Sequence, residues 1–215
     1  MSIRQFSTLD EVIMRLDSTL LGLKKRTSTR KKREFPAKSC ANSNLSLHEK
    51  RHVSGLMRVN HAGEIAAQAL YKAQSLTVRD DKLQEIMKES AEEEFDHLYW
   101  CEKRLDELGE DISRLTPFWY LGSFCIGFFA GSFGDKWNLG FIAETEYQVV
   151  KHLESHIEKL PSSDNRSRAI LERMRDDELH HAEQAEICGA NELPTGVKYL
   201  MRFASKIMTK TSYYI

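Results

Sequence analysis

The sequence has little of what marks a disulfide-stabilised, nucleic-acid-binding or membrane-spanning protein. Its four cysteines are scattered, with no Cys-x-x-Cys pair, which favours reduced thiols over a disulfide framework or a zinc cage. The formal net charge is -1, so the chain lacks the global positive field of a nucleic-acid-binding protein. The one long uncharged stretch, residues 117–134, is interrupted by glycines and is shorter than the roughly 20 apolar residues that a spanning helix needs.

Only four prolines occur in the 215 residues, and apolar side chains recur at helical spacing over long stretches, so the sequence predicts an all-α protein. Ser46 and Glu49 form a capping-box pattern that starts a helix reaching about residue 78. Three further long helices are predicted over residues 80–108, 136–160 and 163–188. Because short links join the first two helices and the last two, the four helices predict a bundle.

The region before the bundle has a different character. A capping-box pattern from Thr8 to Glu11 predicts an amphipathic helix near the N-terminus, and its acidic residues argue against a secretory or mitochondrial leader. Residues 22–45 then lose helical periodicity, and residues 24–33 within them contain seven cations in ten residues. This pattern indicates a flexible basic linker, with contact to anionic lipid or another polyanion as the functional alternative. We therefore expect an N-terminal region over residues 1–45 and a bundle domain over residues 46–215.

Two pairs of acidic and imidazole side chains lie on helical stripes that face the predicted core. Glu178 and His181 are three residues apart, so a helix turns both toward nearly the same side, and the apolar positions of that helix run through them. Glu94 and His97 repeat this arrangement on the helix predicted over residues 80–108. Because burying an uncompensated carboxylate is costly, an ordinary solvated helix face does not account for these pairs.

The other two long helices each supply one inward glutamate. Glu64 lies on the apolar stripe of the first helix. In the third helix, Glu146 is in step with the apolar positions, whereas Glu144 shares its side with Lys151, so the phase favours Glu146. Each inward glutamate precedes a Glu-x-x-His motif by 30 or 32 residues, which indicates an internally repeated helix pair.

Four carboxylates and two imidazoles that point into one interior predict a site for two metal ions. Oxygen and imidazole ligands suit iron or manganese better than soft metals, and four negative charges offset two divalent cations. The predicted ligands are Glu64, Glu94, His97, Glu146, Glu178 and His181. Glu92, Glu93 and Asp96 fall outside the stripes and are predicted to be surface acids, and His180 is predicted to lie at the surface or beside a ligand. The alternative is a set of buried polar pairs without a metal.

A further histidine motif, from His48 to His52, matches the His-Glu-x-x-His pattern of zinc proteases. It lies in the first turns of its helix, and its Glu49 is better explained as the acid of the capping box. Glu49 also precedes Glu64 by 15 residues, which is about 22 Å along a helix and too far to join the same site. The sequence therefore disfavours a protease.

The segments that carry these residues resemble a known family. GLMRVNHAGEIAAQALY, EEEFDHL, ETEYQV and RDDELHHAEQA closely resemble the demethoxyubiquinol hydroxylase family, the di-iron monooxygenases of ubiquinone biosynthesis. The likeness covers residues 46–215, and the N-terminal helix with its basic linker is similar to the longer bacterial form. The resemblance implies a ferritin-like four-helix bundle whose ligands are the same six residues.

The resemblance also implies an activity, which is hydroxylation of a polyprenylated demethoxyquinol ring by O2 on the way to ubiquinone. The implied cofactor is a pair of iron ions, Fe2+ in the resting reduced state, which Glu94 and Glu178 would bridge. The remaining ligands would bind one iron each: Glu64, Glu146, His97 and His181. The resemblance does not identify the electron donor, for which the quinol itself and a nicotinamide are both candidates. The implied partners are the polyprenyl quinol, anionic lipid, other ubiquinone-biosynthesis enzymes and a second copy of the chain, with no nucleic acid among them.

Because the substrate resides in a bilayer, the resemblance implies a peripheral protein on the cytoplasmic side of the bacterial inner membrane. The apolar segment 117–134 would enter one leaflet as a hairpin or, as the alternative, form part of the core. Its aromatic residues would line a route to the irons: Trp119, Tyr120, Phe124, Phe128 and Phe129. Gly127 and Gly131 have the Gly-x-x-x-Gly spacing that permits close helix contact and suits a dimer. Residues 195–212 interleave basic and apolar side chains and predict an interfacial helix.

Three other functions are compatible with parts of this pattern. Another ferritin-like di-iron oxidoreductase would use the same ligands. An iron-storage protein would oxidise iron in the same kind of bundle within a soluble shell, but the apolar segment 117–134 argues against such a shell. A purely structural bundle attached to a membrane would bind no metal.

Overall fold

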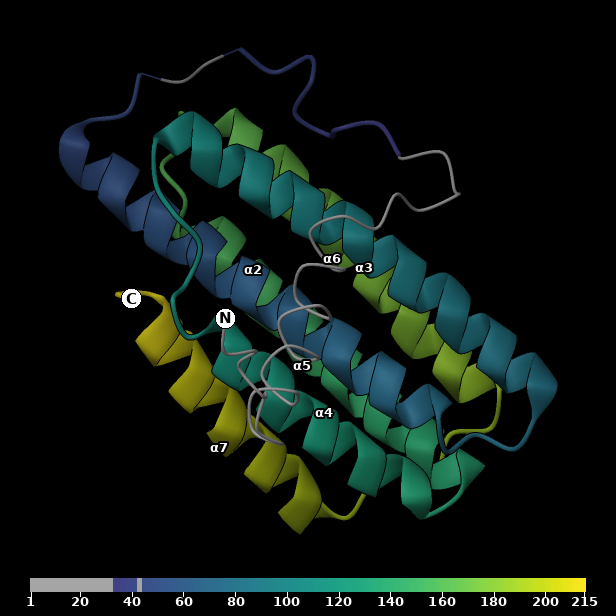
Figure 1. Ribbon diagram of the computed structural model, residues 1–215. Coiled ribbons are helices and arrows are strands. Elements are labelled where there is room, and N and C mark those ends of the chain that lie inside the picture. The colour runs from purple at the N-terminus through teal and green to yellow at the C-terminus, as the bar shows by residue number, and fades with distance from the viewer. Residues whose placement is uncertain (1–32, 42–43) are drawn as a thin grey trace, which may run out of the picture. The chain divides into compact units, whose positions relative to one another are not determined.

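The computed structural model describes residues 33–41 and 44–215, so the helix predicted near the N-terminus and most of the basic linker lie outside the described residues. Residues from Arg33 onward form one compact unit, and the described part of it contains helices and no strand (Figure 1). The helices are α2 (Leu47–Ser75), α3 (Asp81–Leu108), α4 (Thr116–Ser132), α5 (Asp135–Lys159), α6 (Asn165–Ile187) and α7 (Thr195–Ser212). The prediction of an all-α fold is confirmed.

The helices α2, α3, α5 and α6 form the predicted bundle, with α2 packed on α3 and α5 packed on α6 (Figure 1). Their ends follow local signals in the sequence. At the start of α2, the Glu49 backbone N–H donates to Ser46 Oγ (3.3 Å) and the Ser46 backbone N–H donates to Glu49 Oε2 (2.9 Å), as the capping-box pattern predicts. The α3 helix ends at Gly109, whose φ of 68° is a left-handed conformation that glycine adopts without strain.

Two apolar clusters fill the bundle on either side of its middle. The first includes Met57, Trp100 and Met174, and the second includes Tyr71 and Met87. Along each of the four bundle helices, the predicted metal ligands lie between residues of the first cluster and residues of the second. The packing of both clusters therefore sets the positions of the ligands.

The apolar segment expected as a hairpin forms one continuous helix, α4, which packs on α2. A Cβ added to Gly127 would lie 2.8 Å from the Leu70 carbonyl oxygen, and one added to Gly131 would overlap the Thr77 side chain. The Gly-x-x-x-Gly spacing thus permits a close helix contact, as predicted, but this contact is made with α2 of the same chain. Across residues 33–41 and 44–215, no helix combines the length and the apolar character needed to cross a membrane.

The last part of the predicted flexible linker is packed against the bundle. Phe35 is buried in the first apolar cluster, and the Lys103 ammonium lies 4.0 Å from the centre of its ring. Arg166 Nη1 donates to the Cys40 carbonyl oxygen (2.6 Å). The prediction of a flexible linker is therefore wrong for residues 33–41, because an aromatic side chain two residues after the basic run anchors this segment in the core.

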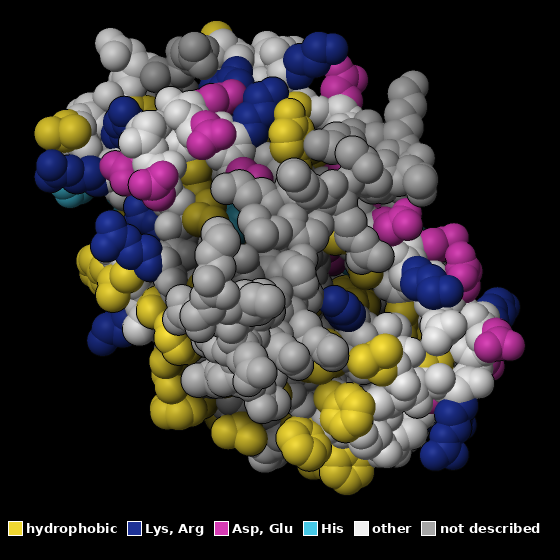
Figure 2. Space-filling view, in the orientation of Figure 1, with side chains coloured by type: hydrophobic (Ala, Val, Ile, Leu, Met, Phe, Trp, Pro, Cys, Tyr) yellow, Lys and Arg dark blue, Asp and Glu magenta, His cyan; other side chains and the backbone are white. Residues whose placement is uncertain are grey.

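Apolar side chains gather on the outer surfaces of α4 and α7. Phe118 and Phe129 on α4 are 71% and 67% exposed, and Leu200 and Phe203 on α7 are 67% and 61% exposed. Figure 2 shows hydrophobic side chains along the lower edge of this face, where α7 and α4 lie in Figure 1. The two helices thus present an exposed apolar surface.

We expect Gly127→Ala to lower the free energy of unfolding by about 1–3 kcal/mol, because the added Cβ would force α4 away from the α2 backbone. Gly122→Ala in the same helix is the control, since a Cβ at Gly122 meets no atom within 4 Å. The higher helix propensity of alanine should leave this control unchanged or stabilise it by up to about 1 kcal/mol. Urea unfolding followed by circular dichroism measures both variants, and equal stabilities would contradict the close contact.

Candidate metal centre

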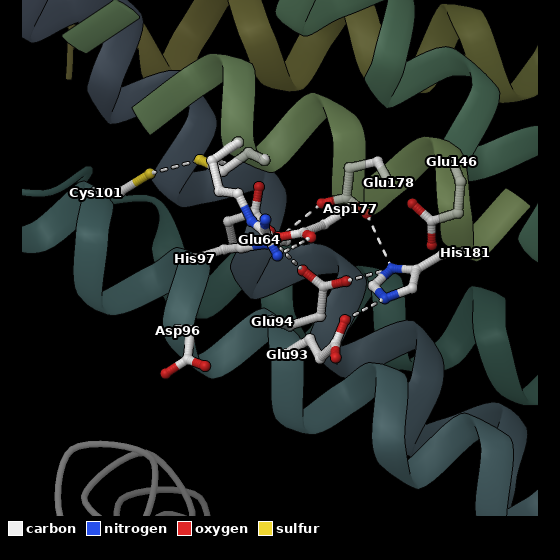
Figure 3. Close-up of polar contacts among 12 residues, drawn as sticks. Glu64, Glu93, Glu94, Asp96, His97, Cys101, Glu146, Asp177, Glu178 and His181 are labelled. Atoms are coloured by element: carbon white, nitrogen blue, oxygen red, sulfur yellow. Dashed lines mark hydrogen bonds and ion pairs between the residues drawn. The ribbon is translucent and has the colours of Figure 1, made fainter. Parts of the chain in front are cut away.

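The six predicted ligands meet in the middle of the bundle (Figure 3), and none is more than 5% exposed. Their donor atoms form two groups, and within each group the atoms lie within 4.8 Å of one another. One group is Glu64, Glu94, His97 and Glu178, and the other is Glu94, Glu146, Glu178 and His181. Glu94 and Glu178 belong to both groups, which is the arrangement expected for two neighbouring metal positions that share two carboxylates.

Both imidazoles turn the same nitrogen toward this cluster. His97 Nδ1 lies 3.1 Å from Glu178 Oε1 and 3.2 Å from Glu94 Oε2, and His181 Nδ1 lies 3.2 Å from Glu178 Oε2. Nδ1 is therefore the nitrogen that each ring offers to a metal, and Nε2 is the one that each ring directs outward.

Each outward nitrogen contacts an acid from the opposite helix. His97 Nε2 on α3 lies 3.0 Å from Asp177 Oδ2 on α6, and His181 Nε2 on α6 lies 3.0 Å from Glu93 Oε2 on α3. A carboxylate in this position keeps the proton on Nε2, orients the ring and makes Nδ1 a stronger metal donor. The sequence carries a signal for this pairing that its analysis missed, because an acid directly precedes the glutamate of each Glu-x-x-His motif.

Two of the acids assigned to the surface from the sequence are in fact part of this arrangement. Glu93 contacts His181, and Asp96 is 6% exposed and accepts a hydrogen bond from Arg33 Nε (3.1 Å). The surface assignment is wrong for Asp96, and for the partly exposed Glu93 it missed the contact with His181. Position relative to the apolar stripe does not account for a polar partner that arrives from another segment. Glu92 is exposed, as predicted.

The α5 helix presents Glu146 to the cluster, as the phase argument predicts. Glu146 Oε1 accepts a hydrogen bond from the Tyr71 hydroxyl (2.7 Å), and Glu146 Oε2 has no hydrogen-bond partner within residues 33–41 and 44–215. Glu144 points elsewhere and lies 3.5 Å from Lys198 Nζ. His180 is exposed, in line with its predicted place at the surface.

Burial and like charge oppose ionisation inside the cluster. Burial, followed by the neighbouring Glu94 carboxylate, raises the pKa of Glu64 well above its ordinary value, and burial, followed by Glu178, does the same to the pKa of Glu146. Burial also acts against the charge on Glu94, but hydrogen bonds from the two histidines outweigh it and hold the pKa of Glu94 well below its ordinary value. The cluster is thus an acidic site that needs added positive charge.

This donor set fits two divalent metal ions. Four carboxylates balance two such ions, the orphaned Glu146 oxygen gains a partner, and oxygen with imidazole suits iron or manganese. The ions would replace the protons that the buried groups otherwise hold, so metal binding should release protons and strengthen as the pH rises.

The histidine motif from His48 to His52 does not join this site. His52 Nδ1 lies 2.7 Å from the Tyr213 hydroxyl oxygen, and its Nε2 lies 3.1 Å from the Lys159 carbonyl oxygen. Both ring nitrogens of His52 thus have partners outside the cluster, Nδ1 in the C-terminal residues and Nε2 at the end of α5. The zinc-protease alternative has no support in this geometry.

A cavity of about 280 Å³ adjoins the cluster, between α2, α4, α5 and α7. Glu64 is one of its lining residues, and the others are mostly apolar, among them Leu70, Ile126 and Phe141. The cavity therefore offers an apolar molecule access to the side of the cluster that Glu64 occupies.

Four polar side chains that line this cavity have buried atoms without a hydrogen-bond partner in the part of the chain that the structure describes. These atoms are Asn60 Nδ2, Glu64 Oε2, Trp119 Nε1 and His152 Nε2. Burial lowers the pKa of His152 to about 4, so its imidazole is neutral at neutral pH. Of the α4 aromatic residues predicted to line a route to the metals, Trp119 lines the cavity, whereas Tyr120, Phe124, Phe128 and Phe129 do not.

A family model described as ubiquinone biosynthesis protein COQ7 matches residues 51–212. The chain belongs to this family. The match includes all six residues of the cluster, and the COQ7 family assignment confirms the resemblance stated from the sequence motifs.

Curated relatives match this COQ7-family chain over nearly its whole length. A protein of Legionella pneumophila strain Corby is 52% identical over 215 residues, which cover 99% of this chain and 100% of the relative. Proteins of Nitrosococcus oceani and Chromobacterium violaceum are each 50% identical, over 99% and 96% of this chain and over 99% and 100% of their own lengths. All three are named 3-demethoxyubiquinol 3-hydroxylase.

We expect Glu146→Gln to weaken or abolish the binding of one of two metal ions, because a neutral amide replaces a carboxylate of the second donor group alone. Glu144→Gln, two residues away on the same helix, should keep both ions. Elemental analysis after anaerobic loading with Fe2+ measures the metal content of both variants. Equal metal content would contradict the choice of Glu146 as the ligand from α5.

Proposed function

We propose that this COQ7-family chain hydroxylates the ring of demethoxyubiquinol with O2 in ubiquinone biosynthesis, using two iron ions that are Fe2+ in the resting state. The observation that supports it most directly is the apolar cavity that adjoins the buried cluster at Glu64. Two irons held by this cluster would supply the reduction of O2 and the transfer of one oxygen atom to the ring. The names of relatives about half identical over their full lengths support the same substrate.

The role of the chain in this reaction would be to hold the two metal ions in a fixed arrangement. Glu94 and Glu178, which belong to both donor groups, would bridge the two ions. Asp177 and Glu93 keep the Nε2 protons of the two histidines engaged on the outer side, so the Nδ1 lone pairs stay directed inward.

The cavity would orient the quinol ring next to Glu64. The neutral His152 Nε2 would accept a hydrogen bond from a ring hydroxyl, and Asn60 Nδ2 would donate one to a ring oxygen. A few polar atoms in an apolar pocket fix the orientation of a ligand, and the apolar walls exclude bulk water from the reacting carbon.

The same surfaces support peripheral attachment to the cytoplasmic face of the bacterial inner membrane. Helices α4 and α7 both line the cavity and carry exposed apolar side chains, and Lys206 and Lys210 on α7 are exposed for contact with anionic lipid. The polyprenyl tail would leave the cavity between these helices and enter the bilayer. Other ubiquinone-biosynthesis enzymes and a second copy of the chain are the protein partners that we propose at this surface.

We expect the full chain, loaded with Fe2+ and given reductant and isotopically labelled O2, to convert demethoxyubiquinol in anionic phospholipid vesicles into a product with one labelled ring oxygen. Glu178→Ala should form no product, and Glu144→Gln should act as the wild type. Mass spectrometry of the extracted quinols measures the label. An iron-loaded wild type that forms no product, or a product whose new oxygen is unlabelled, would contradict the assigned reaction.

The vesicles in this assay also test the membrane contact. Phe203→Glu on the exposed side of α7 should slow turnover of quinol in vesicles several-fold, because a charge there opposes insertion into lipid. The same variant should match the wild type on a short-tailed quinol dissolved without lipid. Equal rates for Phe203→Glu and wild type in vesicles would remove the proposed role of α7.

A further inference from the structure

We propose that Arg33 is a positioning residue for one half of the metal centre, where it holds Asp177 against the outer side of His97. This inference rests on the proposed metal centre. It concerns a residue that precedes the bundle and that the sequence analysis treats as part of a basic linker.

The Arg33 guanidinium joins two helices beside one ligand. Its Nη1 donates to Asp177 Oδ2 on α6 (2.8 Å), and its Nε donates to Asp96 Oδ2 on α3 (3.1 Å). The same Asp177 oxygen accepts the hydrogen bond from His97 Nε2 (3.0 Å). One cation thus sets the position of the carboxylate that orients His97.

The proton positions follow from this geometry. Arg33 Nη2 lies 3.2 Å from His97 Nε2, but a guanidinium nitrogen only donates, and Nε2 carries a proton when Nδ1 faces a metal. That pair is therefore a close approach of two donors, and Asp177 is the acceptor that both of them share. Removing Arg33 would leave the His97 ring as the contact of Asp177 Oδ2, while Arg173 still contacts Asp177 Oδ1.

Arg33 is itself held in place by packing. Its guanidinium carbon lies 4.9 Å from the centre of the Trp100 ring, and the Trp100 ring centre is 5.3 Å from that of His97. Two residues further along the chain, Phe35 is 6% exposed in the first apolar cluster. Because Phe35 already fixes the backbone of this segment, Arg33 loses less conformational entropy when it makes these hydrogen bonds.

The effect should be confined to one metal position. Asp177 acts on His97, which belongs to the donor group with Glu64, whereas the group with Glu146 contains His181. His181 has Glu93 in the corresponding outer position. Loss of Arg33 should therefore weaken one of two metal ions.

The guanidinium shape matters because two acids on different helices must be reached at once. Arginine presents several N–H donors in a rigid planar fork, whereas lysine presents a compact ammonium. Arg33→Lys keeps the positive charge but should bridge Asp96 and Asp177 poorly. It separates the contribution of the charge from that of the bridge.

The chain offers a matched control at the same carboxylate. Arg173 Nη2 contacts the other oxygen of Asp177, Oδ1, at 3.0 Å, and its side chain is 52% exposed. Arg173→Ala removes the same charge from the neighbourhood of Asp177 without cutting a link between α3 and α6. An exposed ion pair of this kind contributes little.

The test is a titration of the metal-free full chain with Co2+, followed by its visible absorption. We expect the wild type to bind two equivalents, and Arg33→Ala to bind one of them about 10–100-fold more weakly, as for other residues that orient metal ligands. Arg33→Lys should fall between the two. Arg173→Ala should match the wild type, and circular dichroism verifies that each variant is folded.

The outcomes separate this inference from the proposed metal centre. A wild type that binds no Co2+ would overturn the metal centre and this inference with it. A wild type that binds two equivalents beside an Arg33→Ala variant of equal affinity would overturn the role of Arg33 alone, as would an equal loss in Arg173→Ala. If Arg33→Ala does not fold, Arg33→Lys decides, because wild-type affinity in that variant would exclude the bridge.

Discussion

Four carboxylates are buried at one place inside the helical bundle, and the surrounding structure is arranged around this concentration of negative charge. Like charges so close together and away from water cannot all ionise without compensation. Burial and the neighbouring carboxylates therefore raise the pKa values of Glu64 and Glu146 in the metal-free cluster. Two divalent ions would balance this charge, so metal binding and the stability of the middle of the bundle are linked.

The fold surrounds this charge with elements that hold it in one arrangement. Apolar clusters lie on both sides of the ligands along every bundle helix, and the crossed pairs His97–Asp177 and His181–Glu93 join α3 to α6 from outside. On the other side of the cluster, α4 and α7 enclose the apolar cavity that reaches Glu64. The polar centre is thus rigid on one side and accessible to an apolar molecule on the other.

The six residues of the cluster could be predicted from the sequence because their positions follow helix periodicity. Glu146 rather than Glu144 faces the cluster for the same reason that Ile142 is buried, which is its angular position on α5. The outer acids could not be found in this way. Asp96 lies off the apolar stripe, and it is buried because Arg33 reaches it from a segment 63 residues earlier. Periodicity describes one helix at a time, and such a contact between distant segments leaves no periodic trace.

The packing of the apolar segment 117–134 as one helix on α2 could not be predicted either, because it also depends on a contact with another segment of the chain. The spacing of Gly127 and Gly131 predicted a close helix contact that suits a dimer, because a glycine pattern indicates close approach without naming the partner. In the fold the partner is α2 with the residues that directly follow it. The Leu70 backbone on α2 and the Thr77 side chain just beyond its end leave no room for a Cβ at Gly127 and Gly131. Sequence reasoning thus identified the close approach but not the helix that makes it.

Anomalous X-ray diffraction from crystals of the iron-loaded protein, collected at the iron absorption edge, would locate the metal ions in the bundle. We expect two anomalous peaks in the middle of the bundle, both within coordination distance of Glu94 and Glu178, one beside His97 and the other beside His181. Peaks elsewhere, or fully loaded crystals with no peak between α3 and α6, would contradict the proposed metal centre.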